Sequence, residues 1–163
     1  MSISVVPAAF SHANAYRNYI VACHADKSID HYDEAIEDSD EYLLSVVNAA
    51  QGLGLPQGYV PQATFFAVDN KQILGAIRVR LGTNKFIENV IGHIGYEVRP
   101  EARNRGVAKH MLQWVLNHVV NEPVAISCGI DNIASQKVIE ASGAVFVCQR
   151  TDKTFGEVKC YRI

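Results

Sequence analysis

The sequence predicts an α/β (α+β) fold in which helices flank a largely antiparallel sheet. Three observations support this class: a strand-like segment opens the chain, three more strand-like segments follow one another in its middle, and strand and helix patterns then alternate to the end. The chain has 163 residues, of which 48% are hydrophobic. That length suffices for one hydrophobic core and is short for two, so we expect a single domain over residues 1–163.

The N-terminal third predicts one strand and two helical stretches. Residues 2–6 alternate as a short strand, and a proline ends it before a helical pattern over residues 10–21. Residues 33–41 hold the most acidic run of the chain. That run leads into a second helix, which should stop near Gly52.

The middle of the chain predicts an antiparallel meander. Residues 63–69 and 73–81 are strand-like and are joined by Asn70-Lys71, a hairpin-type connection. A third strand-like run covers residues 89–100. Consecutive strands with short connections pair in order, so these three should lie side by side.

Helix and strand patterns alternate after the meander. Apolar residues recur at helical spacing from Arg103, residues 123–130 resemble a buried strand, and Asn132 is suited to cap a further helix. Residues 144–150 and 157–163 close the chain as a terminal strand pair.

Charge and cysteine content exclude several classes of partner. The formal net charge of −2 gives no long-range attraction for nucleic acid or anionic membranes. The four cysteines show no C-x-x-C spacing, so we expect neither a metal site nor a disulfide framework. The N-terminus lacks the pattern of a secretory leader and no run approaches the ~20 apolar residues of a membrane span, which predicts a cytoplasmic protein.

The stretch VRPEARNRGVAKHML, residues 98–112, joins a strand end to an amphipathic helix. The first N–H groups of a helix have no intrahelical acceptor and, with the helix dipole, attract anions. Gly106 leaves room for close approach of a phosphate, while Arg103 and Arg105 add forked donors for its oxygens. The segment therefore suits a pyrophosphate, although arginines on the first turn of a helix are also common as solvated surface.

Two motifs together resemble those of the GNAT superfamily of acyl-CoA N-acyltransferases. Its phosphate loop, [R/Q]-x-x-G-x-[G/A], is matched by Arg103, Gly106 and Ala108. Its second landmark, a helix-opening Asn with a small residue three places on and a closing Gly, is matched by Asn132, Ser135 and Gly143. The likeness covers residues 60–148 well. Within the superfamily, the chain is similar to a group of bacterial-type predicted acetyltransferases whose substrates are mostly unassigned.

The resemblance implies a mixed, twisted sheet that splays open between the strand ending at Pro100 and the strand at residues 123–129. Acetyl-CoA would be the acetyl donor, with no metal, and a homodimer would be common. Glu97 and Val98 would pair with pantetheine through the main chain. The remaining cofactor contacts would be Arg103, Arg105, Gly106, Val107 and Ala108 at the pyrophosphate, and Asn132, Ser135 and Lys137 beside it.

An amine nucleophile is protonated at neutral pH, so the proposed chemistry needs a proton acceptor. His93 is the first candidate base and Glu97 the second; strand alternation places both on one face and would allow a shared proton path if no bulge intervenes. His93 is equally suited to a structural role in the sheet. Many relatives carry a Tyr where this chain has Ile139, which leaves the general acid to Tyr96, to Tyr161, or to no group at all.

Two pairs of charged residues are candidates for binding the acceptor. Asp33 and Glu34 in the acidic run suit a cationic amine, and Arg78 and Arg80 on one strand face suit a carboxylate; each pair is otherwise solvated surface. The sequence therefore predicts an N-acetyltransferase acting on a primary amine of a small molecule or peptide. The alternative is a non-catalytic acyl-CoA-binding or sensor domain of the same fold.

Overall fold

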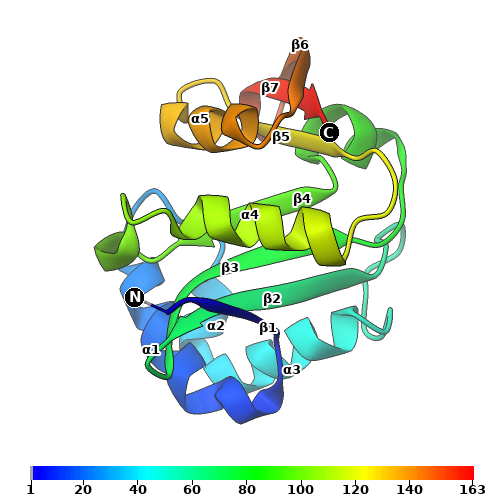
Figure 1. The fold of residues 1–163 in the computed structure, drawn as a ribbon. Coiled ribbons are helices and arrows are strands. Elements are labelled where there is room, and N and C mark those ends of the chain that lie inside the picture. The colour runs from blue at the N-terminus through cyan, green and yellow to red at the C-terminus, as the bar shows by residue number, and fades with distance from the viewer. Residues whose placement is uncertain (1) are drawn as a thin grey trace.

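The computed structural model describes residues 2–163 and contains one seven-stranded sheet in the order β1-β2-β3-β4-β5-β7-β6 (Figure 1). All neighbouring strands are antiparallel except β4 and β5, which are parallel. The predicted fold class is confirmed. The strands are β1 (Ser4–Pro7), β2 (Gln62–Asp69), β3 (Gln72–Arg80), β4 (Ile94–Val98), β5 (Ala125–Gly129), β6 (Val145–Asp152) and β7 (Gly156–Arg162).

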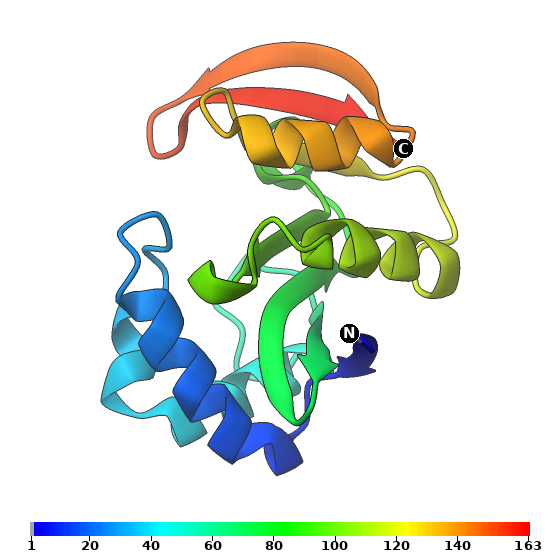
Figure 2. The same cartoon turned by 60° about the vertical axis from the view of Figure 1, so that its left-hand side comes forward.

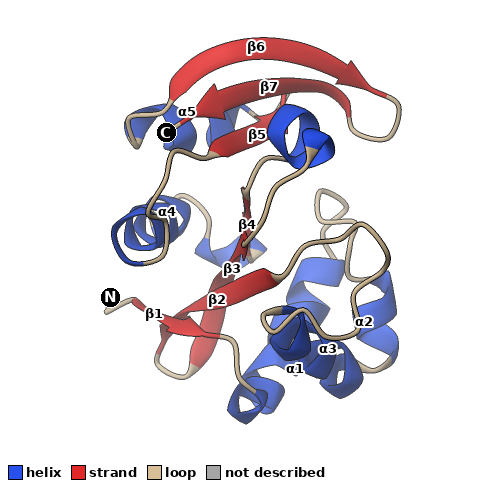
Figure 3. Cartoon of the chain, turned by 90° about the vertical axis from the view of Figure 1, so that its right-hand side faces the viewer, coloured by secondary structure: helices blue, strands red, loops and turns tan. Residues whose placement is uncertain are grey.

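Helices cover both faces of the sheet. The α-helices are α1 (Ala13–His24), α2 (Asp33–Glu37), α3 (Ser39–Ala49), α4 (Val107–His118) and α5 (Ile133–Ala141). Figure 3 shows α1, α2 and α3 on one side of β1–β3 and α4 on the other. Figure 2 shows α5 with β6 and β7 at one end of the molecule, with α4 between them and the N-terminal helices.

Strand alternation sorts apolar side chains into two cores. Phe65 belongs to the core that contains α4, whereas its neighbour Phe66 belongs to the core that contains α1. Ile73 and Leu74 at the start of β3 divide in the same way. Side chains that alternate in this manner bury both faces of the strands, so the central sheet is held from both sides.

The predicted hairpin between β2 and β3 is confirmed. Both of its turn residues, Asn70 and Lys71, have positive φ, at 49° and 65°. Two consecutive left-handed residues follow the right-handed twist of the flanking strands. Gly75 and Val98 pair across β3 and β4, which completes the predicted meander.

The third predicted strand was too long at its N-terminal end. Residues Ile87–Ile91 form a single π-helical turn, and β4 begins only at Ile94. The Asn84 side chain accepts a hydrogen bond from the Ile87 N–H at 2.9 Å and thereby starts the turn. Gly92 ends it at φ 72°, where a Cβ would stand 2.9 Å from the Ala125 carbonyl oxygen, so only glycine fits this crossing over β5.

The helix predicted from Arg103 begins later, at Val107. Asn104 and Gly106 have φ values of 59° and 76°, and left-handed residues interrupt a right-handed helix. Arg103 and Arg105 therefore lie in a turn that precedes α4. The exposed residues of this turn lead into the first turn of the helix.

The parallel strands β4 and β5 separate along their length. Their only register pair is Ile94 with Ile126, at the N-terminal end of β4. Figure 1 shows the two strands running apart beyond this pair. The remainder of β4, including Glu97 and Val98, thus has β3 on one side and no strand partner on the other.

Candidate active site

A cavity of about 1150 Å³ reaches the point where β4 and β5 separate. Its inner end is lined by Arg80, Ile94, Gly95 and Cys128. Its outer wall comes from α2, α3, the loop before β2 and the π-helical turn. Residues of α2 and α3 line the cavity, and Figure 3 shows α4 on the opposite face of the sheet from these helices.

The turn before α4 has the features expected of an anion site. Arg103 is held by Asp26, with Nη1 2.8 Å from Oδ2, and its Nε donates to the Val98 carbonyl oxygen at 3.3 Å. Arg103, Arg105 and Gly106 are exposed. A Cβ on Gly106 would meet nothing within 4 Å, so glycine is needed there for its positive φ. Val107 is buried in the core, which leaves only its backbone for a ligand.

The predicted helix cap at the start of α5 is confirmed. The Asn132 side chain accepts a hydrogen bond from the Ser135 N–H at 3.1 Å. The Ser135 hydroxyl lies 2.8 Å from the Tyr96 hydroxyl of β4, so the two elements meet across the strand divergence. Burial raises the pKa of Tyr96 to about 12, which keeps its hydroxyl protonated at neutral pH. Lys137 is exposed on the same helix.

The other positions considered for a general acid lie elsewhere. Ile139 is fully buried in the core against α4. The Tyr161 hydroxyl donates to Glu140 Oε1 at 2.9 Å, and burial raises the pKa of Tyr161 to about 12. Of these residues, Tyr96 has its hydroxyl beside the strand divergence.

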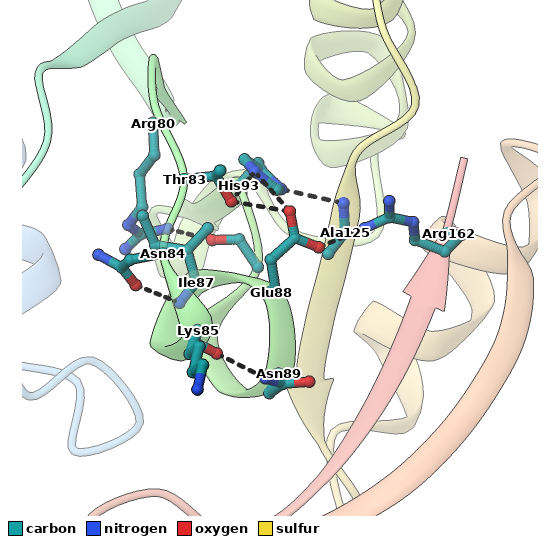
Figure 4. A network of polar contacts seen from close by, with 11 residues as sticks. Arg80, Thr83, Asn84, Lys85, Ile87, Glu88, Asn89, His93, Ala125 and Arg162 are labelled. Carbon is teal, nitrogen blue, oxygen red and sulfur yellow. Dashed lines mark hydrogen bonds and ion pairs between the residues drawn. The ribbon is translucent and has the colours of Figure 1, made fainter.

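Both ring nitrogens of His93 are engaged in a network outside the cavity wall (Figure 4). Nδ1 accepts a hydrogen bond from the Ala125 N–H at 3.0 Å, so the proton of the neutral ring is on Nε2. Nε2 lies 3.2 Å from Thr83 Oγ1 and 3.6 Å from Glu88 Oε1. Burial lowers the pKa of His93, which favours this neutral form. The lone pair that a base would use is therefore occupied.

Glu97 lies in a separate network on the α1 side of the sheet. Arg78 donates to its two oxygens at 2.5 and 2.9 Å, and the hydroxyls of Tyr19 and Tyr32 also donate to it. Burial alone would raise the pKa of Glu97, but the charge of Arg78 and hydrogen bonds from His31 and Arg78 hold it well below its usual range. An ionised carboxylate with these partners is a weak proton acceptor.

His93 and Glu97 share no contacts that would form the proton path, which was expected only if no bulge interrupted the strand. His93 contacts Thr83, Glu88 and Ala125, whereas the partners of Glu97 come from α1, β3 and the segment before α2. The bend at Gly92 and His93 ends the regular strand before Ile94, and this places the His93 ring toward β5. The two side chains would share a face only if the strand continued without a break from His93 to Glu97, and it does not.

Sequence reasoning missed the tyrosines and the histidine around Glu97. His31 Nε2 lies 3.5 Å from Glu97 Oε2, although nothing in the sequence around His31 indicated a role beyond surface or packing. Tyr19 and Tyr32 are fully buried. Buried hydroxyls need partners, so Tyr19 on the apolar face of α1 was the signal that pointed to a polar group in this core.

In each of the two residue pairs expected to bind the acceptor, only one residue lines the cavity. Glu34 lines the cavity, whereas Asp33 is exposed and pairs with His24 at 3.2 Å. Arg78 and Arg80 share a strand face as expected, but only Arg80 lines the cavity. The two residues that reach the cavity are therefore Glu34 and Arg80.

Residues 2–163 contain neither a metal-binding cluster nor a membrane-spanning helix. No group of three or more His, Cys, Asp or Glu side chains in that range is placed to hold a metal ion. None of the helices there is long and apolar enough to cross a membrane. The four cysteines are free thiols in this structure.

Comparison with solved structures gives the same fold at low sequence identity. The ribosomal L7/L12 α-N-protein acetyltransferase RimL, in complex with coenzyme A, is 13% identical with a TM-score of 0.70, over 100% of this chain and 94% of that one. RimJ of Mycobacterium smegmatis, in complex with CoA-disulfide, is 14% identical with a TM-score of 0.73, over 99% and 81%. The microcin C7 self-immunity acetyltransferase MccE, in complex with acetyl-CoA and AMP, is 16% identical with a TM-score of 0.71, over 99% and 91%.

Comparison of sequences identifies the family. No curated protein matches the chain. The sequence model of the Acetyltransferase (GNAT) family matches residues 17–144, which include the turn before α4, both strands of the divergence and α5. This chain belongs to the acetyltransferase (GNAT) family.

Proposed function

We propose that the protein is an acetyl-CoA-dependent N-acetyltransferase that acts on a primary amine. The observation that carries this proposal is the separation of β4 and β5, with an anion-binding turn on one face and a cavity on the other. Donor and acceptor would approach from opposite sides and meet at the divergence. Structural relatives bound to coenzyme A or acetyl-CoA support the choice of donor.

The residues present fit acetyl-CoA. The backbone of Gly106, Val107 and Ala108 would hold the pyrophosphate at the start of α4, with Arg103 and Arg105 supplying positive charge. Val98 would offer main-chain groups to pantetheine along the unpaired side of β4, whereas the backbone groups of Glu97, which were also expected there, face Ala76 of β3. Asn132, Ser135 and Lys137 would border the donor from α5.

The donor would supply an acetyl thioester. Its carbonyl carbon would form a bond to the amine nitrogen as the bond from that carbon to sulfur breaks. The chain contributes position and a proton path. The open cavity lets water take the proton from the amine, and Glu34 is the carboxylate on its wall. The Tyr96 hydroxyl, which shares a hydrogen bond with the Ser135 hydroxyl, would donate a hydrogen bond to the sulfur that leaves with negative charge at the divergence.

His93 and Glu97 would then act as positioning residues. His93 ties β5 to the loop that holds Thr83, and Glu97 ties β4 to Arg78 of β3. Both contacts fix the strands that border the divergence. The alternative assignment of either residue as base predicts a different pattern of variant kinetics, given in the Discussion.

The test is release of the coenzyme A thiol from acetyl-CoA in the presence and absence of amines. An N-acetyltransferase releases thiol in proportion to N-acetylated product, and a panel of amino acids, polyamines, aminoglycosides and peptides covers the main acceptor classes. A sensor domain would bind acetyl-CoA, show a rise in Tm, and transfer to none of them. We further propose that the reaction takes place in the cytoplasm, where free thiols such as those of this chain stay reduced.

A further inference from the structure

Two arginines on one face of β3 have very different surroundings. The Arg78 guanidinium forms a two-point ion pair with Glu97. Arg80 makes one side-chain hydrogen bond, from Nη1 to the Gly92 carbonyl oxygen at 3.1 Å, and no carboxylate among residues 2–163 pairs with it. A guanidinium carries five N–H donors. Most donors of Arg80 therefore have no acceptor within the described chain.

Arg80 lies at the inner end of the cavity, next to the strand divergence. Its Nη1 is 3.8 Å from the point where a Cβ on Gly95 would stand, and Gly95 also lines the cavity. Gly95 directly follows Ile94, the residue of β4 that pairs with β5. Because Gly95 has no side chain, the guanidinium remains accessible beside the place where the acetyl group would be transferred.

The surroundings of Arg80 favour an anion. Burial, followed by the nearby charge of Arg78, lowers the pKa of Arg80 to about 10, so the guanidinium stays charged at neutral pH in a setting that disfavours the charge. A bound carboxylate would offset this cost, and the forked donors of arginine match its two oxygens. Glu34, elsewhere on the same cavity wall, suits the cationic end of a ligand.

We infer that the acceptor is a small amine that carries a carboxylate, as in an amino acid, and that Arg80 binds this carboxylate while the amine reaches the divergence. This inference rests on the proposed function, because it concerns the acceptor of the same reaction. Because Arg80 lies beside Gly95, the carboxylate and the reacting amine of such an acceptor would be separated by only a few bonds. The cavity wall also contains the exposed cation Lys85, which is the alternative binding site for the carboxylate of the acceptor.

The test compares each amino acid with its carboxamide, for example lysine with lysinamide and glycine with glycinamide. The wild-type enzyme should acetylate the best amino acid more efficiently than its amide, with a ratio of the two kcat/KM values of about 10- to 100-fold, the factor expected for hydrogen bonds to a charged group. Arg80→Met should lose this factor on the acid and change little on the amide. Arg80→Lys, which keeps the charge without the fork, should retain part of the preference.

Arg150→Met is the matched control, because Arg150 is an exposed arginine of β6 outside the cavity. It should keep the wild-type ratio of acid to amide. The inference is overturned if acid and amide react equally well, or if Arg80→Met slows both equally. It is also overturned if the preference survives in Arg80→Met and disappears in Lys85→Gln.

A binding measurement decides the inference even if no amine is acetylated. Calorimetric titration of the lysine and lysinamide products, N-acetyllysine and N-acetyllysinamide, into the protein with coenzyme A should show tighter binding of the acid. That preference should be absent in Arg80→Met. Equal binding of acid and amide overturns the inference, whereas preferential binding without transfer would uphold the anion site and refute the proposed activity.

Discussion

Replacement of Glu97 by glutamine tests whether this residue is a structural ion-pair partner or a base. Glutamine keeps the shape of the side chain and can still accept hydrogen bonds from Tyr19 and Tyr32, but it leaves the Arg78 charge without its partner. Removal of one partner of a buried pair costs about 3–5 kcal/mol. For a chain of this length 1 kcal/mol corresponds to roughly 2–4 °C, so Tm should fall by roughly 6–20 °C.

Thermal and urea unfolding at pH 7 measure this effect, with Glu101→Gln as the control. Glu101 also pairs with an arginine, Arg99 at 3.1 Å, but its side chain is 66% exposed. An exposed pair contributes about 0–1 kcal/mol. The control should therefore unfold close to the wild-type protein.

The pH dependence of stability adds a second measurement. The folded-state pKa of Glu97 lies below its ordinary value of 4.5, so its stabilising contribution is present above pH 4.5 and is lost as the pH falls toward the folded pKa. Glu97→Gln should flatten this part of the wild-type profile. A variant that unfolds like Glu101→Gln and instead turns over more slowly would refute the structural assignment and restore Glu97 as a base.

Three further predictions concern His93 and Glu34. The amide of His93→Gln can replace both ring hydrogen bonds, so this variant should turn over the acceptor within a few-fold of the wild-type rate. His93→Ala should lose about 1–3 kcal/mol of stability, because the Ala125 N–H loses its acceptor. A folded His93→Gln variant whose turnover is slower by about 100-fold or more would instead identify His93 as a base. Because burial lowers the pKa of His93, the stability it supplies is present above pH 6.5 and lost below it, and urea unfolding of His93→Gln should lack that dependence. Glu34→Gln should raise the KM of the acceptor at low salt, whereas Asp33→Asn should leave this KM unchanged, because only Glu34 lines the cavity. Equal effects of the two variants in steady-state kinetics would show that the acidic run acts only through its net charge.

Local patterns predicted much of the fold. The hairpin at Asn70-Lys71, the cap at Asn132 and the two strands on either side of the hairpin each depend on neighbouring residues, and each was predicted correctly. The errors occurred where left-handed residues or a side-chain cap interrupt a pattern. Gly92 shortened the third strand, and Asn104 with Gly106 delayed the start of α4.

The site was less predictable, because its networks join residues that are far apart in the chain. Glu97 meets Tyr19, 78 residues away, and His93 meets Ala125, 32 residues away. No periodicity within one element reports such pairings. The sequence identified Arg78 and Arg80 as neighbours on one face, but only the packing of β4 against β3 shows that Glu97 neutralises the first and not the second.

Calorimetric titration of acetyl-CoA into the wild-type protein, Gly106→Glu and Gly106→Ala tests whether the turn before α4 binds the donor. Both variants carry the backbone strain of a side chain at φ 76°, but only glutamate adds bulk and negative charge where the pyrophosphate would bind. We expect binding by the wild-type protein, retained binding in folded Gly106→Ala, and no measurable binding in folded Gly106→Glu. Undiminished binding by Gly106→Glu would contradict the assignment of the turn before α4 as the donor site.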